Sequence, residues 1–182
     1  MQVSSRDRRH DLVVRALSRR ATRGIATISG LKLACALGRT GTAQAAMKRE
    51  GDGKTPVGRF KVRYMLYRPD RQPRPRASIT DIRPLTPADG WCERPGDRHY
   101  NRQVRLPHPA VTDRMWREDH LYDVVVVIDH NERPRLEGRG SAVFIHLARS
   151  GYRPTAGCIA FSRRDLALVL TRLRPGSAVV VV

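Results

Sequence analysis

One cysteine and one histidine near the C-terminus of this 182-residue chain could together carry out nucleophilic chemistry. In the stretch VFIHLARSGYRPTAGCIAF, His146 ends an apolar run and Cys158 directly follows Gly157. A thiol becomes a thiolate at neutral pH only beside a base or a positive field, and an imidazole at a strand end provides one if the loop between them folds back. Glycine lets the backbone approach a substrate closely, so we expect the N–H groups of Gly157 and Cys158 to form an oxyanion hole.

Structural, non-catalytic interpretations of the same residues remain open. Free cysteines are often buried as small apolar side chains, and His146 could be a hydrogen-bonded core histidine, because spacing alone does not show which residues meet in space. Cys35 lies in an apolar, strand-like run and is expected in the core, while Cys92 follows Trp91 and has no matched histidine. Three cysteines imply no disulfide framework. The chain has no CxxC pair and no HExxH, so we expect no structural zinc site.

Short alternating or apolar runs predict the strands that would position this pair, and only one segment has clear helical spacing. Ser29-Gly30 is a tight-turn pair between two alternating runs, which predicts a hairpin over 24–37. Ser162 is a suitable N-cap for a helix over 163–173, which Pro175-Gly176 would end. The fold class is therefore mainly β, a sandwich or barrel with one helix in the C-terminal half. The other predicted strands are 11–17, 60–67, 121–129, 141–146 and 178–182.

A long proline-rich stretch interrupts the predicted strands. Residues 68–119 contain eight prolines, which exclude a long helix or a central strand, and they also contain Trp91, Tyr100 and Trp116. Aromatic side chains in an irregular stretch favour a packed lid or cap, and disorder is the alternative. We thus expect a polar tail at 1–10 and a single domain at 11–182, with 68–119 as a capping insertion.

The charge of the chain suggests a different class of function. Thirty-five Lys and Arg against 17 Asp and Glu give a net charge of +18, which attracts polyanions such as nucleic acid, anionic lipid or an acidic cell-wall polymer. A basic β domain that binds nucleic acid is therefore an alternative, with Tyr64 and Tyr67 as stacking residues, although it gives no reason for the Cys–His pair. No apolar run approaches the length of a membrane helix, and no apolar region follows the basic Met1–Arg9 as in a secretion signal.

Two blocks of the sequence resemble the L,D-transpeptidase (YkuD-type) catalytic domain family. Thr55-Pro56-Val57-Gly58-Arg59-Phe60 matches a Thr-Pro-x-Gly-x-Phe stretch of that family. His146 stands in the place of its strand-end histidine, and Thr155-Ala156-Gly157-Cys158 in the place of its Ser/Thr-His-Gly-Cys segment. The resemblance covers roughly 11–182 without the insertion. Ala156 and Ala160 stand where the family has a histidine and an arginine, which indicates a divergent, proteobacterial-like branch.

The resemblance implies a fold of the YkuD type and a cofactor-free enzyme of the cell wall. Cys158, activated by His146, would form a thioester with one peptidoglycan stem peptide, and an amine of a second stem peptide would resolve it into a 3–3 or 1–3 cross-link. Trimming of stem peptides, as by an L,D-carboxypeptidase, is the alternative within the same family. A main-chain carbonyl orients the histidine in the family, and the Leu147 region could provide it here. The expected location is the periplasm or the cell wall.

Substrate contacts are expected from cations and from the insertion. Stem peptides carry carboxylates, so arginines near His146 are candidates to bind them and to replace the arginine missing at Ala160. Tyr122 is expected to line the cleft or to pack in the core, and residues of a lid would contact the substrate. The substrate-binding candidates are Arg139, Arg149, Arg153, Tyr122, Trp91, Tyr100 and Asn101.

Overall fold

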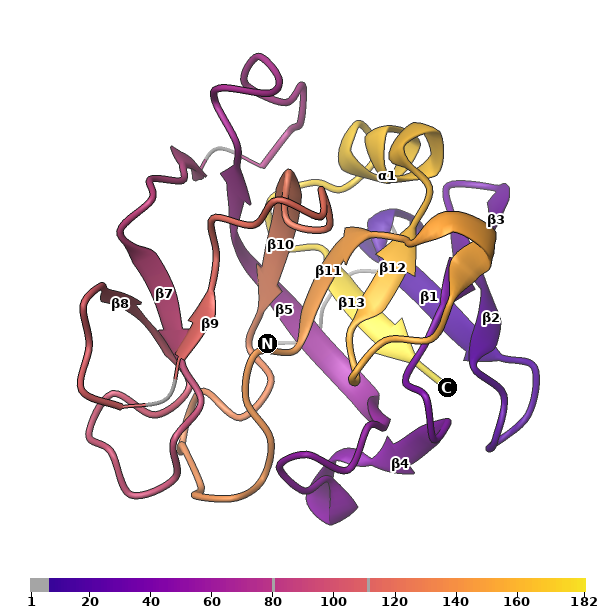
Figure 1. The fold of residues 1–182 in the computed structure, drawn as a ribbon. Coiled ribbons are helices and arrows are strands. Elements are labelled where there is room, and N and C mark those ends of the chain that lie inside the picture. Colours follow the sequence, from indigo (N-terminus) through magenta and orange to yellow (C-terminus); the bar gives the residue numbers. More distant parts are fainter. Residues whose placement is uncertain (1–6, 80, 111) are drawn as a thin grey trace.

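The computed structural model describes residues 7–79, 81–110 and 112–182, so most of the expected polar tail lies outside the described residues. Its main feature is a mixed sheet in the order β10-β11-β12-β3-β2-β1-β13-β5, which closes into a barrel because β10 also pairs with β5 (Figure 1). These strands are β1 (Leu12–Ala16), β2 (Arg23–Ile28), β3 (Leu31–Ala36), β5 (Thr55–Tyr67), β10 (Val124–Ile128), β11 (Phe144–Leu147), β12 (Ile159–Phe161) and β13 (Ala178–Val181). The mainly β prediction is confirmed.

The predicted hairpin is β2 and β3, which pair antiparallel with Ile28 opposite Leu31. Ser29 and Gly30 form its turn with φ angles of 46° and 82°. Two consecutive positive φ angles characterise the turn that matches the twist of a two-residue hairpin. The predicted strand over 60–67 begins earlier, at Thr55, because its first residues pair with the short β4 (Thr42–Gln44). That edge position tolerates Pro56, which has no N–H to donate.

The strand β10 is buried on both faces, which explains its unbroken apolar sequence VVVVI. Val124, Val126 and Ile128 belong to the core inside the barrel. Val125 and Val127 point outward and pack in a second cluster with residues such as Trp91 and Met115 from the insertion. The outer face of this part of the barrel is therefore covered by the insertion rather than by water.

The insertion is folded, and its short strands lie between its prolines. The strand β6 (Ile82–Pro84) pairs with β5, while β8 (Arg102–Arg105), β7 (Asp89–Cys92) and β9 (Thr112–Arg114) form a separate three-stranded sheet (Figure 1). Proline excludes long strands but leaves room for segments of three or four residues. That this insertion opens and closes as a lid stays a prediction.

A buried charge cluster ties the base of the insertion to the barrel. Asp123, whose side chain is 1% exposed, accepts hydrogen bonds from Arg71 at 2.8 Å, from Arg163 at 2.5 Å and from His120 at 3.0 Å. The N–H of Arg68 donates to the carbonyl of Asp123, so the two ends of the insertion meet directly. Burial alone would raise the pKa of Asp123, but the hydrogen bonds from Arg71, Arg163 and His120 outweigh it and lower the pKa.

The one α-helix of the described residues, α1 (Arg163–Leu170), lies across an end of the barrel (Figure 1). The side chain of Ser162 accepts the N–H of Asp165, as predicted for an N-cap, and Leu166, Val169 and Leu170 are buried. The remaining helical turns are of the 3-10 type: η1 (Asp7–His10), η2 (Ala45–Met47) and η3 (Ser150–Tyr152). Across the described ranges, no helix has both the length and the apolar character needed to cross a bilayer.

Candidate active site

Two parallel strands place His146 and Cys158 on the same side of the sheet. The strands β11 and β12 pair with Ile145 opposite Ile159 and His146 opposite Ala160. Side chains alternate along a strand, and Ile145 and Ile159 point into the barrel core. Cys158 immediately precedes β12, and its side chain packs with Phe144 in the outer cluster. The sheet therefore brings the cysteine and the histidine together on the outer face of the barrel, under the insertion.

The His146 ring is held in one tautomer by the backbone. Its Nδ1 lies 2.8 Å from the carbonyl oxygen of Leu147, and because a carbonyl only accepts, Nδ1 carries the proton. The lone pair of Nε2 is then available to take a proton. The side chain is buried, and this burial lowers the imidazole pKa to about 4 despite the hydrogen bond to Leu147, which raises it. The ring is thus neutral at pH 7 and can act as a base.

The thiol of Cys158 is neutral in the resting protein. Its Sγ donates to the carbonyl of Ala142 at 3.1 Å and accepts the N–H of Phe144 at 3.3 Å. Burial raises the thiol pKa to about 12, although the Phe144 N–H lowers it. The resting pair is therefore thiol and imidazole, and the hydrogen bonds of the thiol go to the backbone rather than to His146.

Thr155 stabilises the turn before Cys158, and position 157 in this turn has room only for glycine. The Thr155 hydroxyl donates to the carbonyl of Cys158 at 2.7 Å and accepts the N–H of Gly157 at 3.1 Å. A Cβ on Gly157, where φ is +142°, would lie 2.9 Å from the carbonyl oxygen of Lys54. The participation of the Gly157 N–H in an oxyanion hole stays a prediction, and it requires the hydrogen bond to Thr155 to break.

A pocket of about 270 Å³ opens onto both reactive side chains. This volume is near the lower end of the range for ligand sites. Of the substrate-binding candidates, the structure brings Tyr122, Arg149 and Arg153 to this pocket. The other lining residues are Glu93, Asp113, Arg117, Leu121, Pro154, Thr155, Ala156 and Ala160.

Tyr122 links the histidine to a charged group from the insertion. Its ring meets the His146 ring edge-on at 5.4 Å, and its hydroxyl donates to Asp113 at 2.7 Å. The Arg117 guanidinium lies 5.0 Å from the centre of the Tyr122 ring and donates to Asp113 at 3.1 Å. Burial raises the Tyr122 pKa well above 10, so the phenol stays protonated and holds Asp113 in place.

The Glu93 carboxyl is the unusual acid of this pocket. Burial, together with the neighbouring charges of Asp113 and Glu50, raises its pKa to about 7, although the charge of Arg117 lowers it. No hydrogen bond or ion pair engages this carboxyl within residues 7–79, 81–110 and 112–182. Among the described residues, this carboxyl therefore feels the charge of Arg117 but forms no ion pair, and it lies beside the candidate nucleophile.

Four substrate-binding candidates lie outside this pocket, and the expectation that they contact a substrate there needs correction. Arg139 donates to the carbonyl of Ala46, and the Tyr100 hydroxyl donates to Glu50 at 2.5 Å. The Trp91 indole N–H donates to Asn101 at 3.0 Å. Tyr100 thus ties the insertion, and Arg139 ties the 130–142 segment, to the stretch between β4 and β5, while Trp91 and Asn101 contact each other within the insertion.

Asn101 also supports the nucleophile indirectly. Its carboxamide oxygen accepts the N–H of Ala142 at 3.2 Å, and its nitrogen donates to the carbonyl of His130 at 2.9 Å. The Trp91 ring meets Phe144 edge-on at 4.8 Å. Asn101 and Trp91 thus contact Ala142 and Phe144, the two residues whose backbone groups hydrogen-bond to the Cys158 thiol.

Sequence reasoning missed Glu93, Asp113 and Arg117. All three come from the proline-rich insertion, where no periodicity indicates which side chains face the barrel. Their one sequence signal is that each lies within two residues of a buried aromatic or apolar residue, Trp91 or Met115.

A mainly β barrel that presents a cysteine and a single-tautomer histidine to one pocket is an arrangement expected of enzymes with a cysteine nucleophile. The family model YkuD, described as the L,D-transpeptidase catalytic domain, matches residues 13–182. The chain therefore belongs to the L,D-transpeptidase catalytic domain family, as its resemblance indicated. No curated protein gives a significant match. No solved structure does either.

Proposed function

We propose that this protein is a peptidoglycan L,D-transpeptidase that joins two stem peptides through a thioester on Cys158. The observation that carries the proposal is that Cys158, directly before β12, and His146, on the adjacent β11, line one pocket, with Nδ1 of His146 bound to Leu147 and Nε2 left as the base. Membership of the family supports the reaction class.

In the first step the thiol attacks the carbonyl carbon of an amide that follows an L-centre. Rotation about the Cα–Cβ bond of Cys158 takes the thiol from the Ala142 carbonyl to Nε2 of His146, which accepts its proton as the C–S bond forms. The amide C–N bond then breaks, and the imidazolium gives the proton to the leaving amine of the D-residue. Because both groups start neutral, the proton moves during the attack rather than before it.

In the second step an amine of the acceptor stem peptide attacks the thioester. The amine gives its proton to His146, the C–S bond breaks, and the proton returns to the sulfur, so the products are a new amide and the thiol. Water in place of the amine would give trimming. Glu93, a carboxyl that forms no ion pair among the described residues, lines the same pocket and is suited to bind the acceptor ammonium, to take one of its protons and so to leave the neutral amine that attacks in place of water.

Arginines on the other part of the pocket would bind the carboxylates of the stem peptides. Arg149 and Arg153 are exposed, and no hydrogen bond or ion pair engages Arg153 within the part of the chain that is described. Ala160, opposite His146, leaves space where the family has an arginine, and Arg117 brings a guanidinium into the same pocket from the insertion. We infer that Arg117 replaces the missing side chain.

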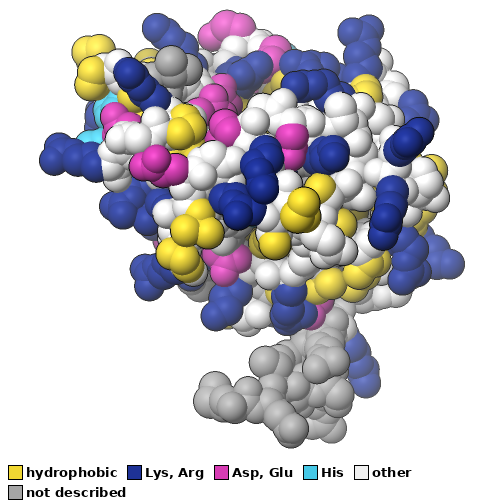
Figure 2. All heavy atoms as spheres, turned by 90° about the horizontal axis from the view of Figure 1, so that it is seen from below, with side chains coloured by type: hydrophobic (Ala, Val, Ile, Leu, Met, Phe, Trp, Pro, Cys, Tyr) yellow, Lys and Arg dark blue, Asp and Glu magenta, His cyan; other side chains and the backbone are white. Residues whose placement is uncertain are grey.

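The charge of the surface also agrees with an acidic polymer as the partner. On the face drawn in Figure 2, Lys and Arg side chains are spread among acidic and apolar ones rather than gathered in one stripe. A nucleic-acid-binding β domain would need its cations and aromatic side chains aligned along a groove. We place the protein at the cell wall, in the periplasm or bound to peptidoglycan, and treat residues 11–182 as one catalytic domain capped by 68–119.

Incubation of the protein with purified cell-wall sacculi, followed by mass analysis of the released muropeptides, tests the proposal. Cross-linked dimers should appear with the protein and disappear with Cys158→Ala, and fragment masses distinguish 3–3 from 1–3 cross-links. Shortened monomers without dimers would identify trimming instead. Salt-dependent retardation of nucleic acid that survives Cys158→Ala, with no change in the muropeptides, would refute the enzyme and favour the binding domain.

A further inference from the structure

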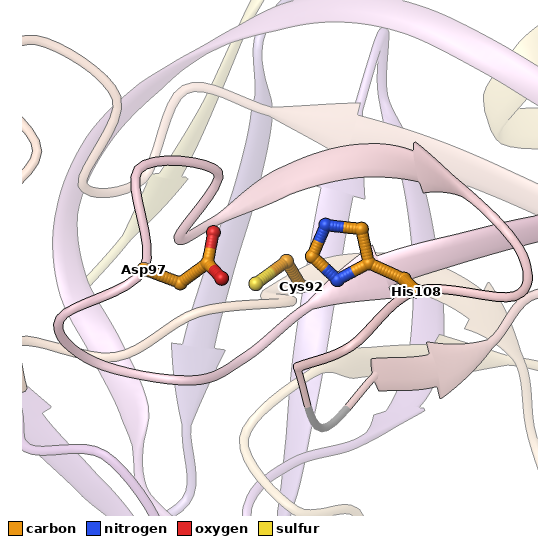
Figure 3. A group of neighbouring side chains, drawn as sticks. All are labelled: Cys92, Asp97 and His108. Atoms are coloured by element: carbon orange, nitrogen blue, oxygen red, sulfur yellow. The ribbon is translucent and has the colours of Figure 1, made fainter.

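A second cluster of reactive side chains lies in the insertion, away from the pocket of Cys158. Figure 3 shows Cys92, Asp97 and His108 pointing toward one another. A sulfur, a carboxylate oxygen and a ring nitrogen, one from each residue, all lie within 4.8 Å of one another. Cys92 ends β7 and is fully buried, while Asp97 and His108 come from the two turns beside it.

A fourth donor, His99, adjoins this group. Its Nδ1 lies 3.2 Å from Asp97 Oδ1 and 3.4 Å from Nε2 of His108. Ligands bound at about 2.0–2.1 Å in a tetrahedron are separated by about 3.3–3.4 Å. The two separations that involve His99 therefore match edges of a tetrahedral metal site, and the Cys92 sulfur lies within 4.8 Å of the Asp97 and His108 donors.

We propose that Cys92, Asp97, His99 and His108 bind one zinc ion. One thiolate, one carboxylate and two imidazoles form a donor set that suits zinc, whereas magnesium and calcium prefer oxygen alone. The Cys92 thiol is 0% exposed, and no acceptor within the described ranges takes its S–H, so a bound cation would give this buried group a partner. The spacing C-x4-D-x-H-x8-H matches no common zinc motif, which is why the sequence predicted none.

The surrounding backbone supports the sulfur and the carboxylate as ligands. The N–H of Arg94 hydrogen-bonds to the Cys92 sulfur, and the N–H of His99 donates to Asp97 Oδ1 at 2.8 Å. Hydrogen bonds of this kind orient ligands and stabilise their charge. The N–H of Asn101 donates to the carbonyl of Cys92 at 2.8 Å, which closes the loop on which three of the four residues lie.

Binding of zinc would change one contact of His108. Its Nδ1 accepts the N–H of Ala110 at 3.2 Å, which places its proton on Nε2. Zinc binding through Nε2 moves that proton to Nδ1 and opens the contact with Ala110. The ion would then join the turn after β7 to the turn after β8, so its role is to stabilise the insertion rather than to take part in the thioester chemistry.

The experiment uses the full chain with Cys158→Ser, so that no metal binds at the candidate active site. Titration with Co²⁺ should give one equivalent of binding with tetrahedral d–d bands and a thiolate-to-cobalt charge-transfer band, and Zn²⁺ should displace it. Adding Cys92→Ser should abolish the charge-transfer band, and His108→Ala should weaken binding more than about 100-fold. Cys35→Ala, which removes another buried thiol in the barrel core, is the matched control and should leave the band unchanged.

A change in stability gives a second readout. Zn²⁺ should raise the melting temperature of the Cys158→Ser protein, and a chelator should reverse the rise. Absence of a charge-transfer band in the Cys158→Ser protein would overturn the proposal without requiring any variant of the cluster to fold. Persistence of the band in the protein that also carries Cys92→Ser would overturn it as well. Neither result would bear on cross-linking by Cys158.

Discussion

Replacing Glu93 by glutamine should stabilise the protein at alkaline pH and impair its amine transfer. The carboxyl lies in the pocket of Cys158 without an ion pair, and burial raises its pKa from 4.5 to about 7. Glutamine keeps the shape and the hydrogen-bonding capacity of the side chain but never becomes charged. The variant therefore removes the free-energy cost of holding a carboxylate in this pocket. It also removes the attraction of that carboxylate for a cationic acceptor.

The size of the stabilisation follows from linkage. An acid whose pKa is raised on folding favours the folded state fully below its unfolded pKa and loses that advantage as the pH rises through its folded pKa. For Glu93 the loss develops between about pH 4.5 and 7. Each pH unit of displacement corresponds to about 1.4 kcal/mol, and because the side chain is partly exposed we expect a net gain of only about 1–2 kcal/mol for Glu93→Gln above pH 7.

Urea unfolding of both proteins over a series of pH values measures this difference. The free energies of unfolding should agree below about pH 4.5, and the advantage of Glu93→Gln should grow between about pH 4.5 and 7 and stay constant above that range. Glu137→Gln, a change at an exposed glutamate, is the matched control and should show no such divergence. In cross-linking assays at pH 8, Glu93→Gln should yield fewer dimers and relatively more hydrolysed monomers.

Two results would refute this reasoning separately. Equal stability of Glu93→Gln and the unmodified protein at every pH would show that the carboxyl is not held at a cost in the pocket. A stabilised variant that forms dimers at an unchanged rate would leave the desolvation argument intact and remove Glu93 from acceptor binding.

Three further predictions concern the base, the buried charge cluster and the turn before the nucleophile. His146→Ala should slow thioester formation by about 10²–10⁴-fold, and formation by the unmodified protein, followed by mass spectrometry against pH, should fall only as the pH approaches the His146 pKa of about 4. Asp123→Asn should lower the free energy of unfolding in urea by about 3 kcal/mol at pH 7, because Arg71 and Arg163 lose their charge partner. The difference between the two proteins should shrink as acid titrates Asp123, and an unchanged free energy of unfolding would contradict the stabilising role of the buried charge cluster. Gly157→Ala should lower the free energy of unfolding by about 2 kcal/mol, because its Cβ meets the carbonyl oxygen of Lys54 and φ is positive. It should also slow thioester formation more than Asp123→Asn does, although Asp123→Asn lowers the stability of the protein by a similar amount.

Much of the barrel was predictable because its strands follow local rules. The hairpin over 24–37 has alternating apolar residues and a turn pair with positive φ angles, and the helix after Ser162 has its cap and its spacing. The strand β12 was missed because three apolar residues after Cys158 carry too little pattern to identify a strand. The strands of the insertion were missed for the same reason, since prolines limit each to three or four residues.

The candidate site was predictable only where it lies on the barrel. His146 and Cys158 are close in sequence, and His146 lies on β11 while Cys158 directly precedes the neighbouring β12, so a single loop brings them together. Arg117 and Glu93 reach the same pocket through long-range packing of the insertion, which leaves no local signal. The neutral state of the thiol also depends on burial, which raises its pKa more than the Phe144 N–H lowers it, and neither effect is visible in the sequence.

The strands β5 and β10 pair antiparallel, and the N–H of Arg68 donates to the carbonyl of Asp123 at their ends. The whole insertion is therefore, in topological terms, the loop of a β-hairpin. The entropy of closing a loop grows only with the logarithm of its length, by about 0.6 kcal/mol for each doubling. Lengthening a four-residue turn to this size therefore costs only about 2 kcal/mol. Evolution can thus exchange or extend what covers the nucleophile at small cost to the barrel, and grafting another sequence between these two anchor points is a practical route to altered acceptor preference.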